Sequence, residues 1–125
     1  MNELSHLKGK TVLVTGANGF IGSHLVDGLL ALDCVVHCLV RSSSNLRWLS
    51  SPKVQIHFVD LADTNFKIPD LQNLKYIFHC AGLTKAKSRK EYFDINSTVC
   101  SNLYEQCLKF KDNIEGIVHL SSLAA

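Results

Sequence analysis

The feature that most constrains this fold is an apolar run that leads directly into three regularly spaced glycines. The segment Thr11–Gly22 has the sequence TVLVTGANGFIG, with glycines at positions 16, 19 and 22. The overlapping segment Phe20–Leu32 repeats its apolar residues at the three- and four-residue spacing of an amphipathic helix. Glycines allow a tight strand-to-helix turn with positive φ and a close approach of the backbone to a diphosphate. Because a helix N-terminus also offers N–H groups to anions, the segment predicts a phosphate-binding turn.

Further apolar runs predict the remaining strands of a parallel sheet. Most are apolar throughout instead of alternating, which is typical of strands covered on both faces by helices. The predicted strands are Thr11–Thr15, Val35–Val40, Val54–Val59, Tyr76–Cys80 and Gly116–Leu120, and the predicted helices are Phe20–Leu32 and Lys90–Phe110. This alternation predicts a doubly wound α/β fold with right-handed crossovers. We expect a short helix over residues 42–49 and a loop or single turn over residues 63–73.

Composition and charge exclude several classes of protein. The 125 residues are 46% hydrophobic and 19% charged, which predicts a folded globular domain and excludes general disorder. The net charge of +2 is spread along the sequence and forms no basic patch for nucleic acid. No apolar stretch approaches the ~20 residues of a membrane span, and residues 1–10 are too polar for a signal peptide. We therefore expect a soluble, cytoplasmic protein.

The cysteines and histidines predict neither disulfides nor a metal site. Five cysteines are an odd number without a Cys-x-x-Cys pair, which is typical of reduced thiols in a reducing compartment. His37, His57, His79 and His119 fall in four separate predicted strands. Neighbouring parallel strands could bring such residues together, but no acidic residue or second histidine stands at ligand spacing beside them. We therefore expect no metal ion.

The glycine spacing separates this turn from two other phosphate loops. Gly16-x-x-Gly19-x-x-Gly22 differs from the commoner Gly-x-Gly-x-x-Gly motif, and the absence of Lys after Gly22 argues against a Walker loop. The longer run VLVTGANGFIGSHL resembles the signature of the extended short-chain dehydrogenases/reductases, which include sugar-nucleotide epimerases and dehydratases, dihydroflavonol reductases and 3β-hydroxysteroid dehydrogenases. The resemblance covers nearly the whole chain. It implies a Rossmann-type sheet of five strands in the order 3-2-1-4-5 and an NAD(P)-binding domain over residues 1–125, with later strands and a substrate-binding part missing.

The resemblance also implies a cofactor site. Asp60-Leu61 matches the position of an acidic residue that meets the adenine, and Cys80-Ala81-Gly82 matches a turn beside the riboses. The cofactor-binding residues that the match implies are Gly16, Asn18, Gly19, Phe20, Ile21, Gly22, Arg41, Ser42, Asp60, Leu61, Cys80, Ala81, Gly82 and Ser121.

A partial catalytic site follows from the same resemblance. Ser122 matches the active-site hydroxyl at the end of the fifth strand, and Asn96 matches a helix asparagine that supports the site. The same helix departs from the family pattern at Val99, which replaces Gly, and at Cys100, which replaces Thr. No Tyr-x-x-x-Lys pair, in which the lysine lowers the pKa of the catalytic phenol, occurs in the chain. We therefore expect the first part of a longer enzyme, inactive by itself.

The end of the second predicted strand bears on the choice of dinucleotide. An Asp or Glu there usually binds a free ribose 2′-hydroxyl, whereas a cation suits a 2′-phosphate. The nearest acid, Asp33, precedes the strand, while Arg41 and Ser42 follow it. This pattern favours NADP over NAD, unless Arg41 only solvates a loop.

Three possible functions stay open, the third being a purely structural Rossmann-like domain that binds no dinucleotide. The first is an NAD(P)-dependent oxidoreductase, epimerase or dehydratase that transfers hydride to or from a small hydroxyl or carbonyl substrate. The alternative is a non-catalytic NADP(H)-binding regulatory module that lacks the Tyr/Lys pair. A homodimer is left open for the longer protein.

Overall fold

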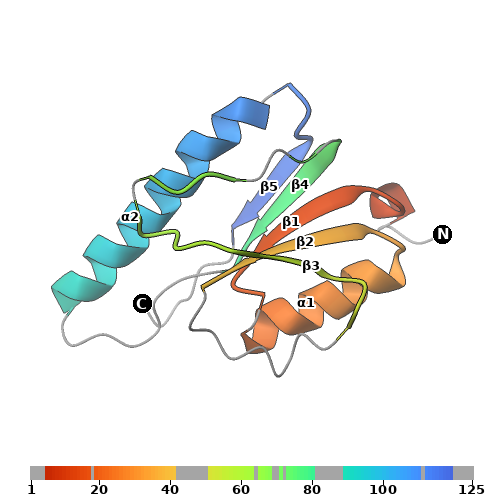
Figure 1. Ribbon diagram of the computed structural model, residues 1–125, viewed down its shortest axis with the longest axis horizontal. Helices are drawn as coiled ribbons and strands as arrows, with labels where there is room; N and C mark the ends of the chain where they lie inside the picture. Colours follow the sequence, from red (N-terminus) through yellow and green to blue (C-terminus); the bar gives the residue numbers. More distant parts are fainter. Residues whose placement is uncertain are drawn as a thin grey trace.

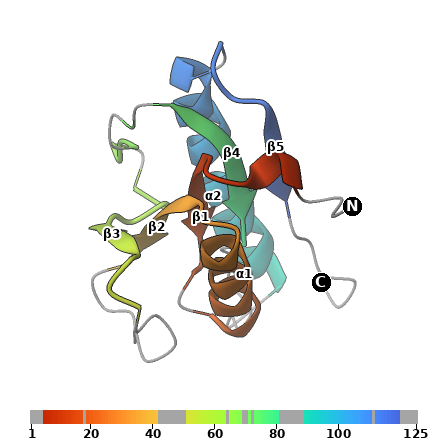
Figure 2. The same ribbon diagram turned by 90° about the vertical axis from the view of Figure 1, so that its right-hand side faces the viewer.

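The computed structural model describes residues 5–17, 19–41, 51–63, 65–68, 71, 73–80, 89–110 and 112–119. Within them lie the strands β1 (Thr11–Thr15), β2 (Val35–Val40), β3 (Gln55–Phe58), β4 (Leu74–His79) and β5 (Gly116–His119), the helices α1 (Phe20–Ala31) and α2 (Arg89–Cys107), and the 3-10 turns η1 (Ser5–Leu7) and η2 (Leu108–Phe110). All strand pairs are parallel, and their order is β3-β2-β1-β4-β5, as Figure 2 shows from one edge to the other. The predicted fold class and strand order are confirmed.

The sheet lies between the two helices (Figure 1). Successive strand residues point to opposite faces, so β1 contributes side chains to two hydrophobic cores, one on each face of the sheet. Val12 and Val14 join the α1-side core, together with Val26 and Leu29 of α1. Leu13 joins the α2-side core, whose helix residues are Val99, Leu103 and Cys107. Burial on both faces explains why β1 and β2 are apolar without alternation, whereas the edge strands β3 and β5 are more exposed.

Among the described residues the predicted element boundaries hold to within two residues, except that α2 ends at Cys107, three residues before its predicted end, and the turn η2 follows it. β1 and β2 have the predicted bounds, and α1 ends at Ala31, one residue before its predicted end. Asp33 ends this helix because it adopts φ 59°, which lets its N–H bond to the Leu30 carbonyl and the Cys34 N–H bond to the Leu29 carbonyl. The sequence pattern missed this Schellman motif because the left-handed residue is not glycine.

Two segments contribute more to the core than their sequences suggested. The predicted loop over residues 63–73 has neither helix nor strand among its described residues, but its apolar side chains Phe66, Ile68 and Leu71 are buried against α2. Near the N-terminus, Leu7 is buried in the α1-side core. The expected short helix over residues 42–49 lies outside the described residues, and none of the described helices is long and apolar enough to span a bilayer.

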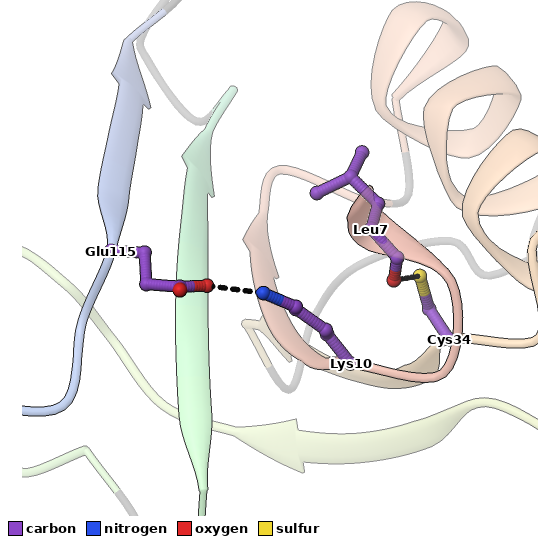
Figure 3. A network of polar contacts seen from close by, with 4 residues as sticks. All are labelled: Leu7, Lys10, Cys34 and Glu115. Atoms are coloured by element: carbon purple, nitrogen blue, oxygen red, sulfur yellow. Dashed lines mark hydrogen bonds and ion pairs between the residues drawn. The ribbon is translucent and has the colours of Figure 1, made fainter. Parts of the chain in front are cut away.

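Polar contacts join neighbouring segments at the edge of the sheet where the strands begin (Figure 3). The Lys10 ammonium lies 2.6 Å from the Glu115 carboxylate, across β4, and the Cys34 thiol donates to the Leu7 carbonyl at 3.1 Å. Both charged groups are solvent-accessible, so the ion pair contributes little to stability. It joins the residue that precedes β1 to the residue that precedes β5.

A matched pair of leucines tests the α2-side core. Leu103 is 0% exposed and Leu108 is 65% exposed. We expect Leu103→Ala to lower the free energy of unfolding by about 2–5 kcal/mol, because it leaves a cavity in a packed core. Leu108→Ala should stay within about 0.5 kcal/mol of the parent chain. Urea unfolding followed by circular dichroism measures both, and equal effects would contradict the assigned core.

Candidate functional site

The glycine turn has the geometry that its spacing predicts. Gly16 follows β1 directly and adopts φ 66°, in the left-handed region that favours glycine. A Cβ added to Gly22 would lie 2.1 Å from the Gly16 carbonyl oxygen, far inside van der Waals contact. The first residue therefore permits the turn, and the last permits α1 to pack directly on it. Asn18 lies outside the described residues.

The N-terminus of α1 has the properties of an anion site. Gly19 is its N-cap and makes no side-chain cap, and the first turn contains no acidic residue. The first intrahelical bond runs from the Ser23 N–H to the Gly19 carbonyl at 2.9 Å. The N–H groups of the preceding three helix residues therefore have no partner within the helix, and no acidic side chain in its first turn neutralises the positive end of the helix dipole. The exposed side chains of Phe20 and Ile21 flank this end.

Several predicted cofactor residues lie at the same edge of the sheet. Gly16, Arg41 and Cys80 each follow the last residue of a parallel strand, so they are placed at its carboxyl edge. This is the edge at which ligands bind in open α/β sheets. The Cys80 N–H bonds to Thr15 through both the carbonyl and the hydroxyl oxygen, at 3.2 and 3.1 Å, which joins the ends of β1 and β4. Arg41 is exposed there.

The backbone at this edge of the sheet is suited to binding a dinucleotide. A diphosphate needs free N–H groups and a close approach to the backbone. The first turn of α1 offers such N–H groups, and Gly16, Gly19 and Gly22 add no side chain there. The clash that a Cβ at Gly22 would make shows that helix and turn are packed as closely as the chain allows.

The predicted adenine-binding residues occupy different environments. The Asp60 side chain is exposed, and its Oδ1 accepts a hydrogen bond from the Ala62 N–H at 3.0 Å, in an Asx turn. Leu61 is buried in the α2-side core. Asn102 of α2 donates to the Leu61 carbonyl at 2.8 Å and so ties this loop to the helix. Sequence reasoning did not assign that role to Asn102, although a mid-helix asparagine on a half-buried face was the available signal.

The remaining predicted site residues fall where the structure gives no side-chain description. Ser42, Ala81, Gly82, Ser121 and Ser122 lie outside the described residues. Asn96 lies within α2, but its side chain is not described. The two catalytic assignments therefore stay predictions.

Two histidines lie closer together than their positions in separate predicted strands suggested. His79 and His119 are register partners on β4 and β5, and their ring centroids are 4.8 Å apart. Cys100 of α2 lies beside both rings. His79 is fully buried, and burial with the nearby His119 lowers its pKa to about 4, so its imidazole is neutral at pH 7. The sequence allowed neighbouring parallel strands to bring histidines together, but it did not show which strands are neighbours or that Cys100 of α2 lies against them.

The cysteines are free thiols, as the odd count without a Cys-x-x-Cys pair led us to expect. Cys34, Cys38 and Cys107 are buried, whereas Cys80 and Cys100 are half-buried. Burial raises the pKa of the Cys38 thiol to about 12 and that of the Cys107 thiol to about 11, so both are protonated at pH 7. The two half-buried thiols are the chemically accessible ones.

Known proteins share both the sequence and the architecture. The model of the NAD dependent epimerase/dehydratase family matches residues 12–125. Sterol demethylase protein B of Methylococcus capsulatus is 30% identical over 117 residues, which cover 92% of this chain and 35% of that protein. Sterol-4-alpha-carboxylate 3-dehydrogenase, decarboxylating, of Bos taurus is 30% identical over 102 residues, which cover 80% of this chain and 27% of that protein. The chain thus spans about a third of these relatives or less.

A solved structure agrees with this match. The Bordetella bronchiseptica enzyme WbmF, in complex with NAD+ and UDP, has a TM-score of 0.74 and 25% identity to this chain. The match covers 95% of this chain and 40% of that one. The family model, the glycine turn and the strand order therefore agree, and this chain belongs to the NAD-dependent epimerase/dehydratase family of extended short-chain dehydrogenases/reductases.

Proposed function

We propose that this chain is the dinucleotide-binding part of an NAD(P)-dependent oxidoreductase, epimerase or dehydratase. The observation that carries the proposal is the contact between α1 and the turn after β1, where a Cβ at Gly22 would lie 2.1 Å from the Gly16 carbonyl oxygen. This packing places the N–H groups of Phe20, Ile21 and Gly22 at the uncapped N-terminus of α1. A diphosphate bound there would accept their hydrogen bonds.

The rest of the dinucleotide would lie along the carboxyl edge of the sheet. Asp60 follows β3 and is exposed, so its free carboxylate oxygen could accept from the adenine amino group. Cys80 follows β4 and would lie beside the riboses, with Ala81, Gly82 and Ser121 as its predicted neighbours. These assignments rest on the family match combined with the positions of the strand ends.

NADP is our proposed form of the cofactor. Arg41 directly follows β2, is exposed, and stands where short-chain dehydrogenases usually discriminate a ribose 2′-hydroxyl from a 2′-phosphate. Its guanidinium suits a phosphate, and Ser42 adds a hydroxyl donor next to it in sequence. The NAD+ of the WbmF complex is a property of that protein.

The chemistry would be hydride transfer at a hydroxyl or carbonyl carbon of a small molecule. The bound nicotinamide would supply the hydride or accept it. Ser122 would donate a hydrogen bond to the substrate oxygen, and Asn96 would support the site from α2. Binding of a dinucleotide without turnover by the full-length protein would instead support the alternative of a non-catalytic regulatory module.

Two alanine substitutions in one helix test the turn. We expect Gly22→Ala to weaken dinucleotide binding by about 10-fold or more, because its Cβ overlaps the Gly16 carbonyl and must push α1 away. Gly28→Ala is the control, since a Cβ there meets nothing within 4 Å in the exposed middle of α1. It should leave binding unchanged and stabilise the fold by about 0.4–1 kcal/mol.

Isothermal titration calorimetry with NADPH and NADH measures the affinities, and thermal unfolding measures stability. Unchanged binding by a folded Gly22→Ala variant would contradict the proposed diphosphate site.

Charge reversal at Arg41 tests the choice of cofactor. We expect Arg41→Asp to weaken NADPH binding by about 10-fold to 100-fold, because a charge-assisted contact contributes about 1.5–3 kcal/mol. NADH binding should change little. Lys53→Asp carries the same charge change but precedes β3, at the opposite edge of the sheet, and should affect neither cofactor. An equal effect of Arg41→Asp on the two cofactors would rule out its contact with a 2′-phosphate.

A further inference from the structure

Three potential metal ligands meet on the α2-facing side of β4 and β5. His79 and His119 are direct register partners on these parallel strands, and Cys100 of α2 lies beside them. The Cys100 Sγ is 3.4 Å from Nε2 of His79 and 3.7 Å from Nε2 of His119. One ligand atom from each residue lies within 4.8 Å of the other two.

These separations suit a tetrahedral metal ion. Zn–S bonds of about 2.3 Å and Zn–N bonds of about 2.0–2.1 Å, at tetrahedral angles, place sulfur and nitrogen ligands roughly 3.6 Å apart. The two Sγ–Nε2 distances, 3.4 and 3.7 Å, already lie close to that value. His119 is exposed whereas His79 is buried, so an adjustment of the ring positions on metal binding would fall on His119.

Both histidines are oriented by partners on their other ring nitrogen. Nδ1 of His79 lies 2.7 Å from the Thr15 hydroxyl oxygen, and Nδ1 of His119 lies 3.1 Å from the Tyr104 hydroxyl oxygen. Metal-ligating histidines usually donate their second N–H to such an outer group, which fixes the tautomer. With Nδ1–H directed outward, each Nε2 lone pair faces the Cys100 sulfur.

With Nδ1–H on both rings, two Nε2 acceptors face a single thiol. A single Cys100 S–H can donate to only one of the two Nε2 lone pairs in this tautomer. A divalent cation would bind both nitrogens and the thiolate at once, with the thiol proton released to solvent. Because His79 is buried and His119 is exposed, the side of the cluster next to His119 is open to a water molecule as fourth ligand.

We propose that His79, Cys100 and His119 form a binding site for Zn²⁺, with water in the fourth position. One thiolate and two imidazoles form a donor set that favours zinc over the hard cations Mg²⁺ and Ca²⁺, which prefer oxygen ligands. Bound zinc would link β4, α2 and β5, which lie in the C-terminal half of the chain. The inference does not depend on dinucleotide binding.

Titration with Co²⁺, a spectroscopic substitute for Zn²⁺, tests the ligand set. We expect one Co²⁺ per chain, with the visible bands of a tetrahedral ion and a near-ultraviolet thiolate-to-cobalt band, both displaced by Zn²⁺. Cys100→Ser should remove the thiolate band, and His119→Ala should abolish tight binding. Tyr104→Phe, which removes only an outer partner, should weaken binding by about 10-fold to 100-fold.

Substitutions elsewhere serve as matched controls. Cys38→Ala removes a buried thiol on β2, and His24→Ala removes an exposed imidazole on α1, so both should leave the cobalt spectrum unchanged. The proposal is overturned if the unsubstituted chain gives no thiolate band, or if the band persists in Cys100→Ser.

Alkylation of the unsubstituted chain gives a second test that no folding defect can obscure. Cys80 and Cys100 are both half-buried, so iodoacetamide should reach both. We expect Zn²⁺ to slow alkylation of Cys100, read by peptide mass spectrometry, with no effect on Cys80. Equal rates at Cys100 with and without Zn²⁺ would contradict the site.

Discussion

The contact between the start of α1 and the turn after β1 is the constraint on which the rest of the structure depends. The left-handed Gly16 reverses the chain, and the missing side chain of Gly22 lets the helix pack against the Gly16 carbonyl. This contact directs Val26 and Leu29 onto one face of the sheet. It also leaves the first N–H groups of α1 at the edge where β1, β2 and β4 end. The same contact therefore determines both the packing of α1 on the sheet and the position of the proposed binding site.

The parallel register of the sheet determines which polar groups meet. Side by side, β1 and β4 place the Thr15 hydroxyl against both His79 and the Cys80 N–H. One strand further, β5 places His119 beside His79. Helix α2 packs against this pair and places the Cys100 sulfur beside both imidazole rings. The proposed dinucleotide site and the proposed zinc site therefore both arise from residues at or near the carboxyl ends of parallel strands.

Local patterns were sufficient to predict most helices and strands and the α/β class, whereas the strand order followed from the family resemblance. β1 and β2 are apolar on both faces, and α1 has a clear helical period, so their bounds were predicted to within one residue. The end of α1 at Asp33 depends on a left-handed residue that is not glycine, and no local pattern marks it. The buried residues Phe66, Ile68 and Leu71 lie in a segment without periodicity, so only tertiary packing reveals their contribution.

The candidate site was also predictable only in part, because some of its contacts depend on tertiary packing. Gly16 and Gly22 are recognisable because a backbone requirement selects their residue type at fixed spacing. The meeting of His79, Cys100 and His119 depends on which strands are neighbours and on how far α2 is shifted along them. Such contacts join residues 19 to 40 positions apart in the chain, which spacing along the sequence does not encode.

Amide hydrogen exchange with and without saturating NADPH reports directly on whether the cofactor binds at the N-terminus of α1. If the diphosphate binds the open end of α1, the amides of Phe20, Ile21 and Gly22 should exchange more slowly in the complex. Residues 112–115, which precede β5 at the opposite edge of the sheet, should exchange at unchanged rates. Bound cofactor with no slowing in the first turn of α1 would contradict the account.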